Sequence, residues 1–226
     1  MRTPSRLRLL AVTVGLAAAA VIAAPATSSA QDAPRAGLFL CQSSLLKLSS
    51  QSWTQANPPL NPCADDFRAL DRQDISVSIF RLQTSLIDVR TDQTPDVLTA
   101  SPPAANDLAF ASARVASIRL TGTSIGTIEF GAVHADATTT CVPGDGGLVP
   151  TFASRSTIAT LRINGTPVLN LTGPVNIPLS FGTLRLNQTE TTSTGLVRRG
   201  AVWDTPLFDV ILAEAKVSVS GNPCRA

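Results

Sequence analysis

Residues 209–220 read DVILAEAKVSVS and form the clearest strand pattern of the sequence. Every second residue of this segment is apolar: Ile211, Ala213, Ala215, Val217 and Val219. Polar side chains alternate with them: Glu214, Lys216 and Ser218. A period of two is typical of a strand with one buried face. We therefore expect residues 209–220 to be a strand that presents the five apolar side chains to a core.

Segments of the same character precede this strand. They are residues 75–79, 111–120, 127–141, 159–163, 168–171, 175–179, 184–186 and 197–202. Asn164-Gly165 supplies two positive φ values and predicts a tight hairpin, whereas Pro178 restricts its strand to a sheet edge. Many short strands without a convincing helical period favour a sandwich or a barrel. We expect an all-β fold, an antiparallel β-sandwich-like domain with a loop-rich N-terminal extension.

The first 30 residues predict a signal peptide. Arg2, Arg6 and Arg8 precede an apolar run over residues 9–24, and small residues lead to a cleavage site after Ala30. Cleavage after Ala24 or Ala26 and retention as a membrane anchor are the alternatives. Removal of residues 1–30 leaves 196 residues, with 15 Lys+Arg against 16 Asp+Glu, because the segment holds three Arg and no acid. No later apolar stretch approaches the ~20 residues that span a bilayer.

The composition and residue pattern of the remaining chain divide it into two parts. Residues 31–107 form an N-terminal segment with strands and Pro-rich loops, and residues 108–226 form the main β domain. A Pro-rich connection over 91–107 joins them. The low charged fraction, 15%, and the near-neutral balance argue against a nucleic-acid partner.

Four cysteines, Cys41, Cys63, Cys141 and Cys224, follow the export signal. An even number in an exported chain predicts two disulfides, for which three pairings are possible. We favour Cys41–Cys63, which closes a turn-rich segment, and Cys141–Cys224, which ties down the C-terminus. The absence of a C-x-x-C pair disfavours a metal site.

A family resemblance follows from the order of motifs in the second half of the chain. ADATTTC at 135–141 precedes INGTPV at 163–168 and LNQ at 186–188, and an apolar strand ends near the last cysteine. This order resembles the secreted actinobacterial choice-of-anchor P family. The resemblance implies an exported β-rich envelope protein, often joined to a variable C-terminal anchor. The sequence stops at Ala226 without one, which leaves both envelope retention and release open. The resemblance transfers no catalytic residues.

His134 and Asp136 are the first weak candidates for chemistry. Residues two apart on a strand share a face, so the pair predicts a base and its orienting acid, or half of a metal site. Ile128 and Phe130 fall on the same alternation, and the pattern leaves open which face is buried. Gly122–Gly126 matches the G-x-S-x-G nucleophile motif, but β-like flanks favour a hairpin turn instead.

Three other features carry weaker signals. Asp65, Asp66, Asp71 and Asp74 form the densest acidic stretch, which we interpret as solvated loop rather than a glycosidase or calcium site. Trp53 is the indole expected to be exposed, and a glycan platform there would need more aromatics. Arg198-Arg199 is an isolated basic pair that suggests a turn.

These observations favour a non-enzymatic protein, secreted or associated with the cell envelope, with a structural, adhesive or binding role. Its partners would be cell-wall or surface components, and no cofactor is expected. A hydrolase that uses His134 with a nearby carboxylate is one alternative. A binder of a small ligand or glycan, with an apolar groove near Trp53, is the other.

Overall fold

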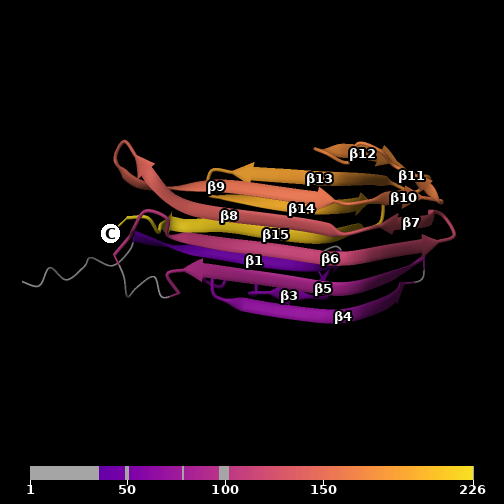
Figure 1. The fold of residues 1–226 in the computed structure, drawn as a ribbon, viewed down its shortest axis with the longest axis horizontal. Coiled ribbons are helices and arrows are strands. Elements are labelled where there is room, and N and C mark those ends of the chain that lie inside the picture. Colours follow the sequence, from indigo (N-terminus) through magenta and orange to yellow (C-terminus); the bar gives the residue numbers. More distant parts are fainter. Residues whose placement is uncertain (1–35, 49–50, 78, 97–101, 226) are drawn as a thin grey trace, which may run out of the picture. The chain divides into compact units, whose positions relative to one another are not determined.

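Strands form all the regular secondary structure in the computed structural model, which describes residues 36–48, 51–77, 79–96 and 102–225 (Figure 1). The predicted signal peptide, residues 1–30, lies outside the described residues. Every pair of neighbouring strands is antiparallel, and two sheets pack face to face. The all-β antiparallel fold predicted from the sequence is thus confirmed.

Seven strands make up one sheet, which we call sheet A: β12 (Val175–Pro178), β13 (Thr183–Thr192), β14 (Gly195–Asp204), β15 (Asp209–Asn222), β1 (Ala36–Leu48), β2 (Gln51–Ser52) and β3 (Gln55–Ala56). Eight strands make up sheet B: β11 (Thr166–Pro167), β10 (Leu161–Ile163), β7 (Gly126–Phe130), β9 (Gly147–Ile158), β8 (Val133–Gly144), β6 (Leu108–Gly122), β5 (Phe80–Thr94) and β4 (Asp66–Val77). We use "outer face" for the face of either sheet that is turned away from the other sheet.

The chain meanders through both sheets and closes on itself. Most sheet neighbours follow one another along the chain, but β1 also pairs with β3, β6 with β8, and β7 with β10. The last strand, β15, pairs with the first, β1, from Ala36↔Asn222 to Leu48↔Val210. The segments on either side of residue 107 each contribute strands to both sheets. Pro178 lies in β12 at the edge of sheet A, as the sequence predicts.

Within β15 the alternation of buried and outward side chains shifts by one residue, so some side chains lie on the face opposite to the one expected. Ala213 has φ 57°, a left-handed conformation that interrupts the alternation of side chains. Ala215, Val217 and the residues beyond keep the predicted alternation. Before Ala213, however, Val210 and Leu212 are fully buried, and Ile211 lies on the outer face. The prediction for Ile211 was therefore wrong.

A second interruption corrects the face of His134. The predicted strand 127–141 is split at Gly131-Ala132 into β7 and β8. Ile128 and Phe130 are buried in the core, but the break moves even-numbered residues to the outer face from His134 onward. His134 therefore does not share a face with Ile128 and Phe130.

Two further expectations were wrong. The acidic stretch is not a loop, because Asp66, Asp71 and Asp74 all lie in β4, which ends at Val77 before β5 begins at Phe80. As an edge strand exposed on both faces, β4 lacks the apolar alternation that would have identified it. Arg198-Arg199 is likewise not a turn but the middle of β14.

Both favoured disulfides are formed, Cys41–Cys63 and Cys141–Cys224. Cys41 lies in β1, and its bond holds the segment that leads from sheet A to sheet B. Cys141 lies in β8 of sheet B, and Cys224 follows β15 of sheet A. The second bond therefore joins the two sheets covalently.

Apolar side chains from the inner faces fill the space between the sheets. Trp203 is 1% exposed, packs edge-on against Phe80 and Phe208, and donates its Nε1–H to Phe181 O at 2.8 Å. A buried indole with a satisfied N–H is a core residue rather than a binding platform.

Candidate functional site

His134 lies among polar side chains on the outer face of sheet B. Its neighbours in the strand register are Arg114 of β6 and Thr157 of β9, and Ser112 faces Asp136 across the same strand pair. Ser112 Oγ lies 3.1 Å from His134 Nε2, Arg114 Nε lies 3.0 Å from it, and Asp136 Oδ1 lies 2.5 Å from it. The expectation that His134 and Asp136 share a face is confirmed.

The geometry of this cluster does not match a catalytic relay. In such a relay the nucleophile and the acid contact different ring nitrogens of the histidine. Here Ser112, Arg114 and Asp136 all converge on Nε2. Burial opposes ionisation of Asp136, but His134, the Ser112 hydroxyl and Arg114 together outweigh it and lower the pKa of the carboxyl group.

The acidic residues of the 65–74 stretch have separate partners. Asp65 Oδ1 accepts from the backbone of Gln93, and Asp66 Oδ2 accepts from the backbone of Asn57. Asp74 pairs with Arg81, whose hydrogen bond lowers the pKa of Asp74 to about 2. In the part of the chain that the structure describes, no group of three or more His, Cys, Asp or Glu could hold a metal ion.

The loop from Asn57 to Cys63 is fixed to β1 at several points. The disulfide joins its end to Cys41, and Cys63 N–H donates to Phe39 O at 2.8 Å. At its start, the buried Asn57 donates from Nδ2 to Cys41 O at 2.8 Å and to Pro62 O at 3.0 Å. The loop is therefore held in one conformation before any partner arrives.

This fixed loop presents Leu60 to solvent. Leu60 is 91% exposed, the highest value among the large apolar side chains described, and has φ 68°. Prolines flank it on both sides in the sequence PPLNPC. Those prolines are the sequence signal that could have identified an exposed leucine, because they exclude the segment from a paired strand.

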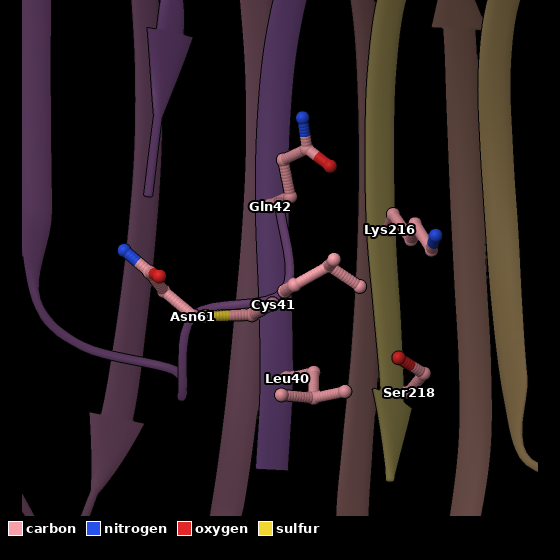
Figure 2. A pocket seen from close by; sticks show the side chains of 7 residues that line it. Leu40, Cys41, Gln42, Asn61, Lys216 and Ser218 are labelled. Carbon is pink, nitrogen blue, oxygen red and sulfur yellow. The ribbon is translucent and has the colours of Figure 1, made fainter. Parts of the chain in front are cut away.

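A hollow lies beside Leu60 on the outer face of sheet A (Figure 2). Leu40 and Gln42 come from β1, Lys216 and Ser218 come from the adjacent β15, and the loop closes the hollow from the other side of β1. Its volume is about 80 Å³. Sites that enclose a small molecule hold roughly 300–1,000 Å³, so this hollow fits one group of a larger partner.

The hollow continues into two others along the outer face of sheet A. Lys216 and Ser218 also line a second hollow, which shares Glu190 with a third around Arg199 and Arg185. Within the described residues Lys216 makes no ion pair, so its ammonium group is available to an anionic partner. We call this row of hollows, from Leu60 past Lys216 to Arg199, the sheet A groove.

Arg199 and Glu190, which line the third hollow, belong to a network of charged side chains. Glu214, 4% exposed, accepts from Lys47 Nζ at 2.8 Å and from Arg199 Nε at 2.7 Å. Arg199 also contacts Glu190 at 3.1 Å. Burial alone would raise the pKa of Glu214, but the two cations outweigh it and lower that pKa. This network could not be predicted from sequence spacing, because its four members lie on four different strands.

Trp53 is exposed, as expected, with 41% of its surface accessible. The hollow beside the N-terminal segment is lined by Leu60 instead, and Trp53 is not among its lining residues. The structure therefore places the groove at a different position from the one expected near Trp53.

Comparisons with protein-family models, with curated proteins and with solved structures find no match. In the described ranges, no helix is long and apolar enough to cross a membrane. The two disulfides fit an extracellular protein.

Proposed function

We propose that this protein is exported and acts outside the cell as a non-enzymatic binding protein of the envelope or the medium. The predicted signal peptide and the two disulfides support export. Membership of the choice-of-anchor P family belongs to the same proposal and rests on the motif order at 135–188.

The single observation that carries the binding role is that Leu60 is exposed to solvent on a loop held in a fixed conformation. An isolated exposed leucine needs no explanation, but this one is held at the tip of a loop fixed by a disulfide and by Asn57. Fixing a contact residue in advance lowers the entropy lost on association. Leu60 is therefore suited to act as an anchor that a partner buries.

The partner is an extended, anionic component of the cell wall or cell surface. The hollow at Leu60 is too small for a whole ligand, and the sheet A groove continues from it past Lys216, which makes no ion pair with any residue that the structure describes. An extended chain can place an apolar group against Leu60 and an acidic group at Lys216. Electrostatic attraction at one exposed lysine contributes modestly and weakens with salt.

The test is co-sedimentation of the purified chain from residue 31, with its disulfides intact, with isolated envelope of the native host. We expect Leu60→Ala to weaken binding about 10- to 100-fold, since burial of a leucine contributes about 1.5–3 kcal/mol. The matched control is Leu169→Ala, because Leu169 is likewise exposed, at 79%, but lines none of the three hollows of the groove. Equal binding by both variants would remove Leu60 from the contact, and no binding by the wild type would reject an envelope partner.

The hydrolase alternative rests on the contact between Ser112, His134 and Asp136. Their convergence on one ring nitrogen supports the non-enzymatic proposal. Assays of the purified chain against broad hydrolase substrates test the alternative directly. Turnover that His134→Ala abolishes would establish an enzyme, and absence of turnover by the wild type supports a binding role.

A further inference from the structure

One ring nitrogen of His134, Nε2, contacts a hydrogen-bond donor and a carboxylate. Arg114 donates its Nε–H to this nitrogen at 3.0 Å, which requires a lone pair on Nε2. Asp136 Oδ1 lies 2.5 Å from the same nitrogen, and an ionised carboxylate can only accept, which requires a proton on Nε2. One nitrogen cannot hold a lone pair and a proton at once, so the two contacts belong to two protonation states of the ring.

The proton of the second contact has to come from the ring. Burial opposes ionisation of Asp136, but His134, Ser112 and Arg114 hold the pKa of its carboxyl group below the ordinary value. The carboxyl group is therefore ionised over the range in which a histidine ordinarily titrates, about pH 5 to 8. The Ser112 hydroxyl suits both states, because it can donate to Nε2 in one and to Asp136 in the other.

The charged groups around His134 lie on four neighbouring strands of sheet B (Figure 1). They are Asp88, Arg90 and Asp92 on β5, Arg114 on β6, Asp136 on β8 and Arg155 on β9. Arg90 pairs with Asp92, and Arg155, opposite Asp136 in the strand register, forms no ion pair with the described residues. Asp88, opposite Arg114, forms none with them either, so it can receive Arg114 when His134 releases it.

We propose that His134 exchanges Arg114 for Asp136 as its partner when the pH falls. The neutral ring carries its proton on Nδ1, and Nε2 accepts from Arg114. In the protonated ring Nε2–H donates to Asp136, and Arg114 turns toward Asp88. The outer face of sheet B thereby gains one positive charge in mildly acidic surroundings. The exchange takes place on sheet B, so it does not depend on the binding role proposed for the sheet A groove.

The test is nitrogen NMR of the purified, isotope-labelled chain from residue 31 as a function of pH. His134 is the only histidine of the sequence, so its ring signals need no assignment. We expect a proton on Nδ1 and none on Nε2 above the transition, and protons on both nitrogens below it. A proton that stays on Nε2 at every pH would overturn the proposal, because Nε2 could then never accept from Arg114.

Arg114→Met separates the exchange of partners from a simple effect of charge. Methionine offers no donor, so the neutral ring should move its proton to Nε2 and donate to Asp136 at every pH. Arg155→Met is the matched control, because it removes the same charge opposite Asp136 without removing a hydrogen bond to the ring, and it should leave Nε2 unprotonated above the transition. Both arginines are exposed, so both variants should keep the wild-type thermal unfolding temperature.

Asp136→Asn removes the second partner and gives an independent readout. It should lower the pH midpoint of the ring titration by about 0.5 unit, because the protonated ring loses its carboxylate. Arg114→Met should raise the midpoint, because the protonated ring then no longer lies beside a guanidinium group. An unchanged midpoint in Asp136→Asn, or an Arg114→Met ring that keeps its proton on Nδ1, would overturn the exchange.

Discussion

Gly200 of β14 lies directly against Val133 of β8, where sheets A and B face each other. A Cβ atom at Gly200 would lie 2.5 Å from Val133 Cγ1. The strand register places Gly200 opposite Ala213 of β15 and Asn187 of β13, both of which have positive φ. The two sheets thus approach each other closely at Gly200, level with the positions where β13 and β15 have positive φ.

Gly200→Ala should lower the free energy of unfolding by about 1–3 kcal/mol, because the added methyl group overpacks the space held by Val133. Denaturant unfolding measures the loss. Gly146→Ala is the control, since a Cβ there would meet only the end of the Arg225 side chain.

The same contact predicts coupling between the two positions. Val133→Ala removes the methyl group that blocks the new side chain, so the double variant should lose less stability than the sum of the single variants. Strict additivity would show that the two side chains are not in contact.

Replacing Glu214 by Gln should cost about 3 kcal/mol, because it leaves Lys47 and Arg199 without their shared carboxylate. Glu190→Gln is the control; Glu190 contacts the same Arg199 but its side chain is 61% exposed, so its loss should be about 0.5 kcal/mol. Equal losses would contradict the assignment of Glu214 as the centre of the network.

The pH dependence of stability tests the charge of Glu214. Its folded-state pKa is lowered, so ionised Glu214 stabilises the fold above its unfolded pKa, and this contribution is lost as the pH falls through the folded pKa. The stability difference between the wild type and Glu214→Gln should therefore shrink in acid. A difference that stays constant down to low pH would contradict the lowered pKa.

Removing the two disulfides one at a time should affect stability and envelope binding to different extents. The chain-entropy relation gives about 4–5 kcal/mol for Cys141–Cys224, which spans 83 residues, and about 3 kcal/mol for Cys41–Cys63, which spans 22. Paired Cys→Ser variants, measured under conditions where both remain folded, should show the larger loss of envelope binding for Cys41/Cys63. A larger binding loss for Cys141/Cys224 would contradict the role of the Leu60 loop.

The sequence predicts most of the strands and the Asn164-Gly165 hairpin because these follow from local chemistry, and the favoured pairing among the three possible for the four cysteines is the one formed. The strand expected over 168–171 is not formed, because the strand after the hairpin, β11, ends at Pro167. Alternation fails where a backbone conformation changes phase within a strand, as at Ala213, and alanine gives no sequence signal of a positive φ. This is why Ile211 was expected on the wrong face. His134 was grouped with Ile128 and Phe130 because the break at Gly131-Ala132 splits the expected strand in two.

The candidate site was only partly predictable. His134 and Asp136 could be placed on one face because they are two residues apart. The hollow lined by Leu60, Leu40 and Lys216 joins segments that are distant in sequence. They come together because β15 pairs with β1 and the Cys41–Cys63 disulfide holds the loop to β1. The pairing of the first and last strands is a property of the whole topology.

The measurement that tests the central claim most directly is fractionation of the native host, with intact mass and N-terminal analysis of the protein recovered. We expect the protein in the wall fraction or the medium, beginning at Gln31, with a mass that rises by about 4 Da on reduction of its two disulfides. Recovery from the cytoplasm with residues 1–30 retained and no mass change on reduction would contradict the account.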